Sequence, residues 1–138
     1  CSSDLLIGLS ARTDHEGAEA LAGLLAELGY RAEVAATPPE VLHLKTASSL
    51  LDEETVLATK TLAATGIFAG FRVIEVPEGE EGGANVLRVN DRVLAGAGYP
   101  RILEALDAHG LNVVPLANNA IAAIDAGFTC MSLRWRGD

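Results

Sequence analysis

Aromatic residues, basic residues and cysteines are all scarce in this sequence. Phe, Trp and Tyr make up only 4% of its 138 residues, so the core must consist mostly of Leu, Val, Ile and Ala. Ten Lys and Arg stand against 19 Asp and Glu, and the net charge of -9 argues against a nucleic-acid partner, which needs clustered cations. No apolar run approaches the roughly 20 residues of a membrane-spanning helix, so no membrane partner is expected.

The two cysteines, Cys1 and Cys130, are too few for a disulfide framework, and no spacing of Cys or His is typical of a zinc site. We therefore expect a reducing, cytoplasmic compartment and neither a metal nor a cofactor. No interdomain linker is visible, so residues 1–138 are expected to form a single partial unit. Because the sequence begins with Cys1 and not with Met, we expect a fragment or a processed product. An N-terminal cysteine can be a nucleophile with its own amine as base, but no oxyanion donor is visible for that role.

Three segments of the sequence resemble one another: each has a helix-like stretch, then a glycine, then a β-rich run. The glycines, Gly29, Gly70 and Gly110, lie 41 and 40 residues apart, a period typical of repeat architectures. Glycine is favoured just after a helix because it adopts the left-handed conformation without a Cβ clash. The pattern predicts three helices, at 14–28, 60–69 and 100–109, and three following strands, at 30–34, 71–76 and 111–116.

Further strands are predicted before each helix, at 4–10, 55–59 and 92–96. Two of these strands are preceded by another, at 42–51 and 85–89, and the second pair is joined by Asn90-Asp91, a tight hairpin signal. The repeating unit is therefore strand, strand, helix, strand. The first unit lacks its first strand, and a strand at 128–135 is left without a partner.

The first predicted helix carries Leu21, Leu24, Leu25 and Leu28 on one face, the spacing of a buried apolar stripe. Either Thr13 or Asp14 can cap its N-terminus. The acidic, Gly-rich stretch at 78–83 is interpreted as a solvated loop that could reach over a binding site.

Cys130 and His43 are the candidate nucleophile and base. A cysteine in an apolar strand is more often a buried small hydrophobic residue, and a lone histidine on an apolar strand is usually structural. However, a Gly-containing turn leads directly into Cys130, where loop-borne active residues lie. Both residues also occupy the first strand of a predicted repeat, and equivalent positions converge on the axis of a ring of repeats. A thiol needs such a neighbouring base to become a nucleophile.

Arg12 follows the first predicted strand. A solvated loop charge is the simpler interpretation, although a guanidinium can clamp a carboxylate in two-pronged geometry. His15 and His109 lie in or at the ends of predicted helices among polar neighbours, and both are interpreted as surface residues.

Four pieces of the sequence together resemble the dimethylarginine dimethylaminohydrolase family, within the guanidino-group-modifying (pentein) superfamily that also holds arginine deiminase and the amidinotransferases. They are GLSARTDHEGAEAL (8–21), LHLKTASSLL (42–51), GANVLRVNDRVLAGAGYP (83–100) and DAGFTCMSLR (125–134). Their order matches the C-terminal part of that family. The resemblance implies an α+β fold, an α/β propeller of ββαβ repeats, with about three of five blades in this chain.

The resemblance also implies roles for five residues. Cys130 is similar to the nucleophile that attacks the guanidinium carbon and forms a covalent thiouronium intermediate, and His43 to the general acid/base. Arg12 corresponds to the ligand of the substrate's α-carboxylate. The main-chain carbonyls of Leu42 and Ile124 match positions that touch the substrate.

The acidic residues that hold the guanidinium in this family lie in its N-terminal part, and no carboxylate of this chain matches their motifs. Because an unpaired buried cation costs several kcal/mol, about the energy of a broken ion pair, the chain alone is expected to bind substrate poorly. A hydrolase acting on a guanidino substrate is therefore expected to need the N-terminal part of the same enzyme. Three alternatives stay open: an amidinotransferase with the same Cys and His, a non-catalytic homo-oligomer that pairs through open strand edges, and a hydrolase with Cys1 as nucleophile.

Overall fold

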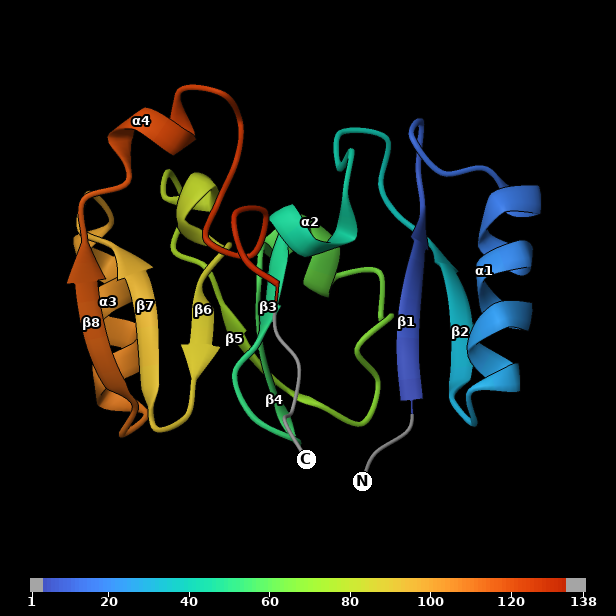
Figure 1. Ribbon diagram of the computed structural model, residues 1–138. Coiled ribbons are helices and arrows are strands. Elements are labelled where there is room, and N and C mark those ends of the chain that lie inside the picture. The colour runs from blue at the N-terminus through green and yellow to red at the C-terminus, as the bar shows by residue number, and fades with distance from the viewer. Residues whose placement is uncertain (1–3, 134–138) are drawn as a thin grey trace.

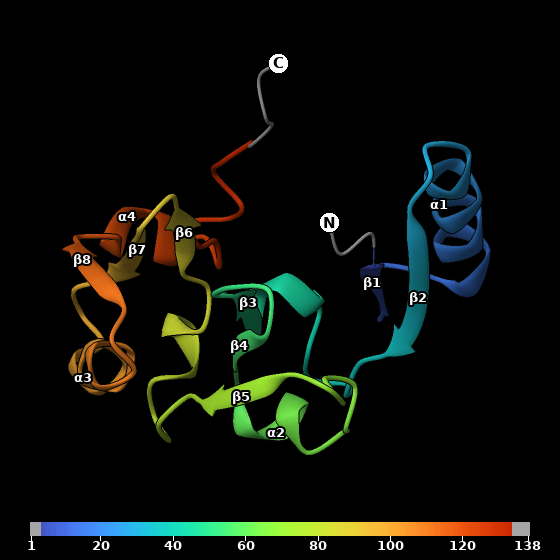
Figure 2. The same ribbon diagram turned by 90° about the horizontal axis from the view of Figure 1, so that it is seen from below.

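The computed structural model describes residues 4–133 and contains three small β-sheets with helices packed on their outer side (Figure 1). Seen from below, the sheets follow one another in an arc that is open on one side (Figure 2). Each sheet is built from neighbouring segments of the chain, so the arc follows the order of the predicted repeats.

The first unit consists of strand β1 (Asp4–Leu9), helix α1 (His15–Glu27) and strand β2 (Arg31–Ala36). The two strands pair in parallel. Asp14 caps the helix, since its side chain accepts a hydrogen bond from the N–H of Gly17 at 2.8 Å. Within residues 4–133 no strand pairs with the other edge of β1, as predicted.

The second unit contains strand β3 (Ser48–Leu50), strand β4 (Thr55–Ala58), helix α2 (Lys60–Ala63) and strand β5 (Arg72–Glu75). β3 pairs antiparallel with β4, and β4 pairs in parallel with β5 across the helix. This is the predicted order of strand, strand, helix and strand.

The third unit repeats this order with strand β6 (Leu87–Val89), strand β7 (Arg92–Gly96), helix α3 (Pro100–Ala108) and strand β8 (Asn112–Leu116). β6 and β7 form the predicted hairpin, whose turn residue Asn90 has a φ of 56°, a conformation that Asn tolerates. β7 and β8 are parallel.

The three glycines that defined the repeat all have the predicted left-handed conformation. Their φ angles are 82° at Gly29, 94° at Gly70 and 76° at Gly110. Gly29 and Gly110 let the chain leave a helix, and Gly70 ends the turns that follow α2; after each glycine comes a strand parallel to the one before the helix. The mixed α/β architecture of strand–strand–helix–strand units is thus confirmed.

Two clusters of aliphatic side chains form the core, and Phe68 is the one aromatic residue among its buried members in the described part of the chain. The larger cluster joins the second and third units. The smaller one lies on the other side of β4 and receives Leu6 of β1 as a partly buried neighbour. The first unit is therefore attached to the others by a thinner apolar contact.

The sequence overestimated two elements. Helix 60–69 ends after four residues, because the chain turns at Thr65 and Gly66, where φ is 76°. Strand 42–51 is reduced to β3, because residues 44–46 form a short 3-10 helix, η1 (Leu44–Thr46). Its turn is held by side-chain bonds from Thr46 Oγ1 to the His43 carbonyl and from Ser48 Oγ to the Leu44 carbonyl.

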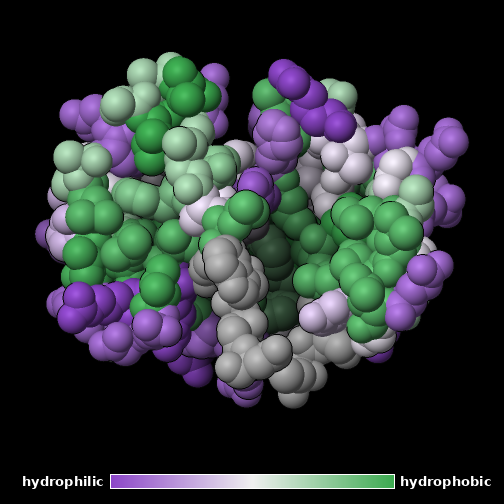
Figure 3. Space-filling model, in the orientation of Figure 1, coloured by the Kyte–Doolittle hydropathy of each residue, from purple (hydrophilic) through white to green (hydrophobic). Residues whose placement is uncertain are grey.

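The helix at 14–28 is present, but its leucine stripe is not buried. Leu24 is 60% exposed and Leu28 is 73% exposed, and Ala18 is the one buried residue of α1. Figure 3 shows apolar side chains gathered on the first unit, beside the hollow that separates it from the second unit. In the described part of the chain, no helix has the length and hydropathy needed to cross a membrane.

Candidate active site

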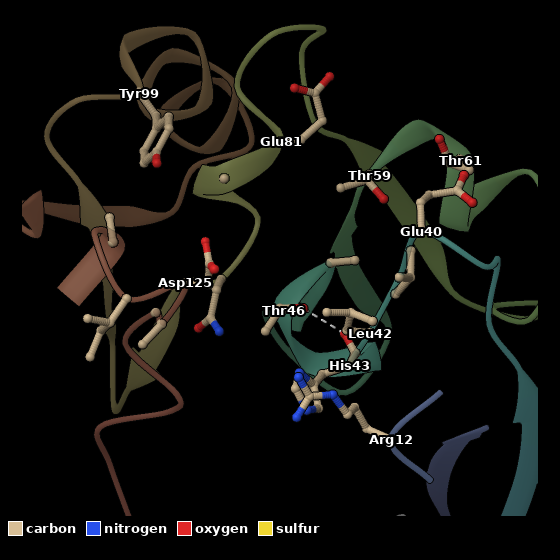
Figure 4. A pocket seen from close by; sticks show the side chains of 18 residues that line it. Arg12, Glu40, Leu42, His43, Thr46, Thr59, Thr61, Glu81, Tyr99 and Asp125 are labelled. Carbon is tan, nitrogen blue, oxygen red and sulfur yellow. Dashed lines mark hydrogen bonds between the residues drawn. The ribbon is translucent and has the colours of Figure 1, made fainter. Parts of the chain in front are cut away.

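The inner side of the arc holds an open cavity of about 610 Å³, lined by residues from all three units and from the segment after β8 (Figure 4). Four of the five predicted site residues line it: Arg12, Leu42, His43 and Ile124. Its wall also carries the carboxylates of Glu40, Glu81 and Asp125 and the hydroxyls of Thr46, Thr59, Thr61 and Tyr99.

His43 lies just before η1, in an extended conformation (φ -141°, ψ 127°), and its side chain is exposed. Its carbonyl accepts hydrogen bonds from the N–H of Thr46 at 3.0 Å and from Thr46 Oγ1 at 2.8 Å. The prediction that His43 lies in a strand is therefore wrong. Because the turn after it is closed by these two bonds, its backbone position is well defined.

Arg12 lies in the turn between β1 and α1 and extends toward His43 (Figure 4). This turn is closed by reciprocal bonds between the backbones of Ser10 and Thr13. Ser10 Oγ accepts from the N–H of Arg12 at 3.1 Å and donates to the carbonyl of Leu42 at 2.7 Å. One hydroxyl thus ties the arginine turn to the histidine segment, a role that the sequence analysis did not assign to Ser10.

The carbonyl of Leu42, which the resemblance matches to a substrate contact, is thus already engaged as an acceptor. Its side chain is exposed on the cavity wall. Ile124, the other predicted contact, follows helix α4 (Asn119–Ala122) and has a side chain that is 70% exposed. Both residues line the same cavity.

Cys130 lies in a turn and not in a strand, so this part of the predicted strand 128–135 is wrong; residues 134 and 135, like Cys1, lie outside the described residues. The turn is closed by a bond from the N–H of Cys130 to the carbonyl of Gly127 at 3.1 Å. Cys130 is exposed and forms no disulfide, so it is not the buried small hydrophobic residue that a cysteine in an apolar segment usually is.

Cys130 is not itself part of the cavity lining, but both groups that hold it are. Gly127 lines the cavity, and so does Asn85, whose Nδ2 donates to the Cys130 sulfur at 3.5 Å. Asn85 Oδ1 accepts from the N–H of Thr129 at 3.0 Å. The sequence analysis did not single out Asn85, although it lies inside one of the four family-like pieces.

The acidic loop at 78–83 differs from the solvated loop that the sequence predicted, although it does reach the cavity. Glu80 is only 7% exposed and accepts hydrogen bonds from the backbone N–H groups of Arg101 and Ile102, at the start of α3. The next residues form a short 3-10 helix, η2 (Glu81–Gly83), at the cavity wall. One residue of this polar loop, Glu80, is thus buried and caps the N-terminus of α3.

Glu81 is exposed on the cavity wall. The backbone N–H of Gly79, 2.9 Å from Glu81 Oε1, lowers the pKa of this carboxyl below its usual value, with further lowering from its own backbone N–H and from the Arg101 charge. A Cβ at Gly83 would lie 2.6 Å from the ring of Tyr99. The glycines of this loop therefore allow η2 to pack directly on Tyr99, another residue of the cavity that sequence analysis missed.

Thr59 adds a polar atom without a partner. Its side chain is buried and its Oγ1 has no hydrogen-bond partner among the described residues, although the residue lines the cavity. His15 and His109 are exposed, as predicted, and neither lines the cavity. The described residues include no group of three or more His, Cys, Asp or Glu side chains that could hold a metal ion.

No family model matches the sequence. The chain is 39% identical over 129 residues to N(G),N(G)-dimethylarginine dimethylaminohydrolase from Pseudomonas aeruginosa, a match that covers 94% of this chain and 50% of the relative. A solved structure of dimethylarginine dimethylaminohydrolase from the same organism, a cysteine-to-serine mutant complexed with citrulline, matches with a TM-score of 0.90 and 37% identity, over 96% of this chain and 52% of that one.

An amidinotransferase of saxitoxin biosynthesis from Microseira wollei has a TM-score of 0.86 at 23% identity, over 100% of this chain and 46% of that one, so this likeness concerns the fold alone. The chain spans about half the length of the curated relative it matches. By sequence and by fold, nearly the whole of this chain is similar to about half of a dimethylarginine dimethylaminohydrolase.

Proposed function

We propose that this chain carries the nucleophile and the acid/base of an amidine hydrolase, which cleaves a C–N bond of a dimethylarginine- or arginine-like substrate. The observation that carries the proposal is that Arg12, Leu42, His43 and Ile124 line one cavity. Cys130 is hydrogen-bonded to Asn85, another residue of the cavity wall. The related structures support it, since one is a cysteine mutant complexed with citrulline and another a histidine-to-glycine adduct with S-methyl-L-thiocitrulline.

The proposed reaction has two steps. The Cys130 thiolate attacks the guanidinium carbon, and the C–N bond to the leaving amine breaks as His43 protonates that amine, which leaves a covalent thiouronium. His43 then takes a proton from water, whose oxygen attacks the same carbon. The C–S bond breaks, the thiolate is regenerated, and the product is a urea. An exposed, unpaired thiol suits this role, because it is reached by substrate without unfolding.

In this proposal Arg12 binds the α-carboxylate of the substrate, and the carbonyls of Leu42 and Ile124 contact it. A guanidinium can bind a carboxylate through two parallel hydrogen bonds, and the Ser10 bridge fixes the Arg12 turn relative to the histidine segment. The Ser10 bond already occupies one acceptor direction of the Leu42 carbonyl, so the substrate would share that oxygen. Because a free thiolate needs reducing conditions, we place the reaction in the cytoplasm.

The N-terminal part of the same enzyme is the proposed partner. Among residues 4–133 no strand pairs with one edge of β1, whereas the corresponding strands β4 and β7 each pair with an antiparallel strand. Beside it lies an apolar groove of about 630 Å³ between the first and second units. An unpaired edge next to exposed leucines favours the addition of a further strand. The competing occupant is a second copy of the chain, and native mass spectrometry of the chain, alone and with the N-terminal part, separates the two.

The test combines the chain with the N-terminal part of the same enzyme and follows dimethylarginine consumption. Cys130→Ser should abolish turnover, while His43→Gly should leave a covalent adduct on Cys130 with S-methyl-L-thiocitrulline, detected by intact mass. Unchanged activity of Cys130→Ser would refute the proposal. Arginine labelled in its guanidino carbon separates hydrolysis, which yields a labelled urea product, from amidinotransfer, in which the label appears in an acceptor amine.

A further inference from the structure

Asn85 uses both ends of its amide to hold the turn that carries Cys130. It lies between η2 and β6, 45 residues before the cysteine, and is only 6% exposed. Its Nδ2 donates to the sulfur at 3.5 Å, and its Oδ1 accepts from the N–H of Thr129 at 3.0 Å. A side chain that is buried and bonded at both ends has one conformation, so it defines where the turn lies.

The backbone on both sides of Asn85 is itself anchored. Ser49 Oγ, on β3, donates to the carbonyl of Ala84 at 2.8 Å and accepts from the N–H of Val86 at 3.0 Å. Ala84 and Val86 are buried in the larger core cluster. β3 comes soon after His43 and η1 in the chain. Through Ser49 and Asn85, the turn that carries Cys130 is therefore attached to the strand that follows the histidine.

The packing of the turn on Asn85 is as close as its hydrogen bonding. A Cβ at Gly127 would lie 2.3 Å from Asn85 Cγ, a distance that no real Cβ contact shows. Position 127 must therefore be a glycine for the amide to reach the sulfur. The glycine and the amide line the cavity, and the thiol is held against them by the Asn85 hydrogen bond.

We propose that Asn85 is a positioning residue for Cys130, which fixes the turn and directs an N–H at the sulfur so that the thiolate is favoured over the thiol. A thiolate accepts this hydrogen bond better than a thiol does, and bonding to the charged form favours that form. The inference rests on the proposed function, in which Cys130 is the nucleophile. The other charged or titratable groups at this cavity are Arg12, Glu40, His43, Glu81, Tyr99 and Asp125.

The test measures the rate of Cys130 alkylation by iodoacetamide as a function of pH, in the full chain, by mass spectrometry of the peptide that contains Cys130. Asn85→Asp keeps an oxygen for the N–H of Thr129 but replaces the donor with a negative charge. Asn85→Leu removes both bonds. Asn112→Asp is the matched control, since it makes the same change of charge on the exposed strand β8.

In Asn85→Asp we expect the midpoint of the pH–rate profile to rise by about one unit, which slows alkylation at neutral pH about tenfold. A smaller rise is expected in Asn85→Leu and none in Asn112→Asp. The new charge of Asn85→Asp raises the thiol pKa by itself, so the neutral variant decides: if Asn85 served the fold alone, Asn85→Leu would keep the wild-type profile, and that result would overturn the proposal. Thermal melts of each variant are recorded in parallel, and if Asn85→Leu does not fold, the smaller Asn85→Ala takes its place.

Alkylation requires no guanidino substrate, so this test can fail or succeed independently of the proposed hydrolase. A shifted profile without substrate turnover would leave Asn85 as a positioning residue of a thiol with another role. Turnover that survives in Asn85→Asp together with an unshifted profile would keep the hydrolase and remove Asn85 from its mechanism.

Discussion

The buried carboxylate of Glu80 is predicted to be a main source of stability of the third unit. Tyr99, the residue before α3, does not cap the helix with its side chain. Pro100, the first residue of α3, has no N–H that needs an acceptor. Glu80 supplies the missing acceptors from outside the helix, at 3.2 Å from the N–H of Arg101 and 3.0 Å from that of Ile102. It also forms an ion pair with the Arg101 guanidinium at 3.4 Å.

The magnitude follows from these contacts. Loss of a helix N-cap costs about 1 kcal/mol, and a buried donor left without a partner costs about 1–3 kcal/mol. The ion pair adds at most a few tenths, because the Arg101 side chain is 55% exposed and solvent screens it. We therefore expect Glu80→Ala to lower the free energy of unfolding by about 2–4 kcal/mol, since Ile102 N–H would be buried without an acceptor. Glu80→Gln keeps one oxygen acceptor and should cost about half as much.

Urea unfolding followed by circular dichroism measures these values, and the midpoint should fall without a change in slope. Glu104→Gln, the same chemical change at an exposed position of α3, is the matched control and should stay within about 0.5 kcal/mol of the wild type. The reasoning is refuted if Glu80→Gln and Glu104→Gln destabilise the chain equally. Such a result would mean that the start of α3 is solvated and needs no cap.

Three further predictions concern the cavity and the second unit. Gly127→Ala should lower the free energy of unfolding by about 1–3 kcal/mol and slow turnover, because its Cβ displaces Asn85; melting and activity assays check both. Ser10→Ala should raise the KM of the reconstituted enzyme about 3- to 10-fold by freeing the arginine turn. The Glu54 N–H holds the pKa of Asp52 below its ordinary value, so the stability advantage over Asp52→Asn should be full above the ordinary carboxyl pKa and be lost, in pH-dependent melts, as the pH falls through the lowered pKa.

Local signals predicted the repeat because they act within one unit. Gly29 and Gly110 each end a helix in the left-handed conformation, Gly70 ends the turns after α2 in the same conformation, and Asn90 marks the tight hairpin between β6 and β7. These requirements hold whatever the rest of the chain does. The strand–strand–helix–strand order could therefore be inferred without knowing how the units pack.

The errors lie where side-chain bonds to the backbone compete with regular structure. The apolar run around His43 is typical of a strand, yet Thr46 and Ser48 bond to carbonyls behind them and close a turn instead. Hydropathy patterns carry no information about such bonds. Glu80 is the opposite case, since its buried role depends on a helix that begins about 20 residues later in the chain.

The site was predictable only in part for the same reason. The residue types and family-like surroundings of Cys130 and His43 make them candidates, whereas nothing in the sequence pointed to the groups that hydrogen-bond to their segments. Ser10 and Asn85 act through contacts between units, at sequence separations of 32 and 45 residues. Common polar residues with such roles give no local pattern, and the structure alone reveals them.

The leucine stripe of α1 shows that a helix can be predicted correctly from its periodicity while the burial of its apolar face is predicted wrongly. Leu21, Leu24 and Leu28 follow the spacing of a buried face, yet all three are exposed. A helix of 13 residues is marginal by itself in water and normally depends on an apolar face that is packed. Among the described residues β1 also has an open edge, and the apolar groove lies between this unit and the second. In the proposed complex the N-terminal part covers the first unit, so Leu24→Asp should weaken the association of the two parts, measured by native mass spectrometry, while leaving the core of the other two units intact.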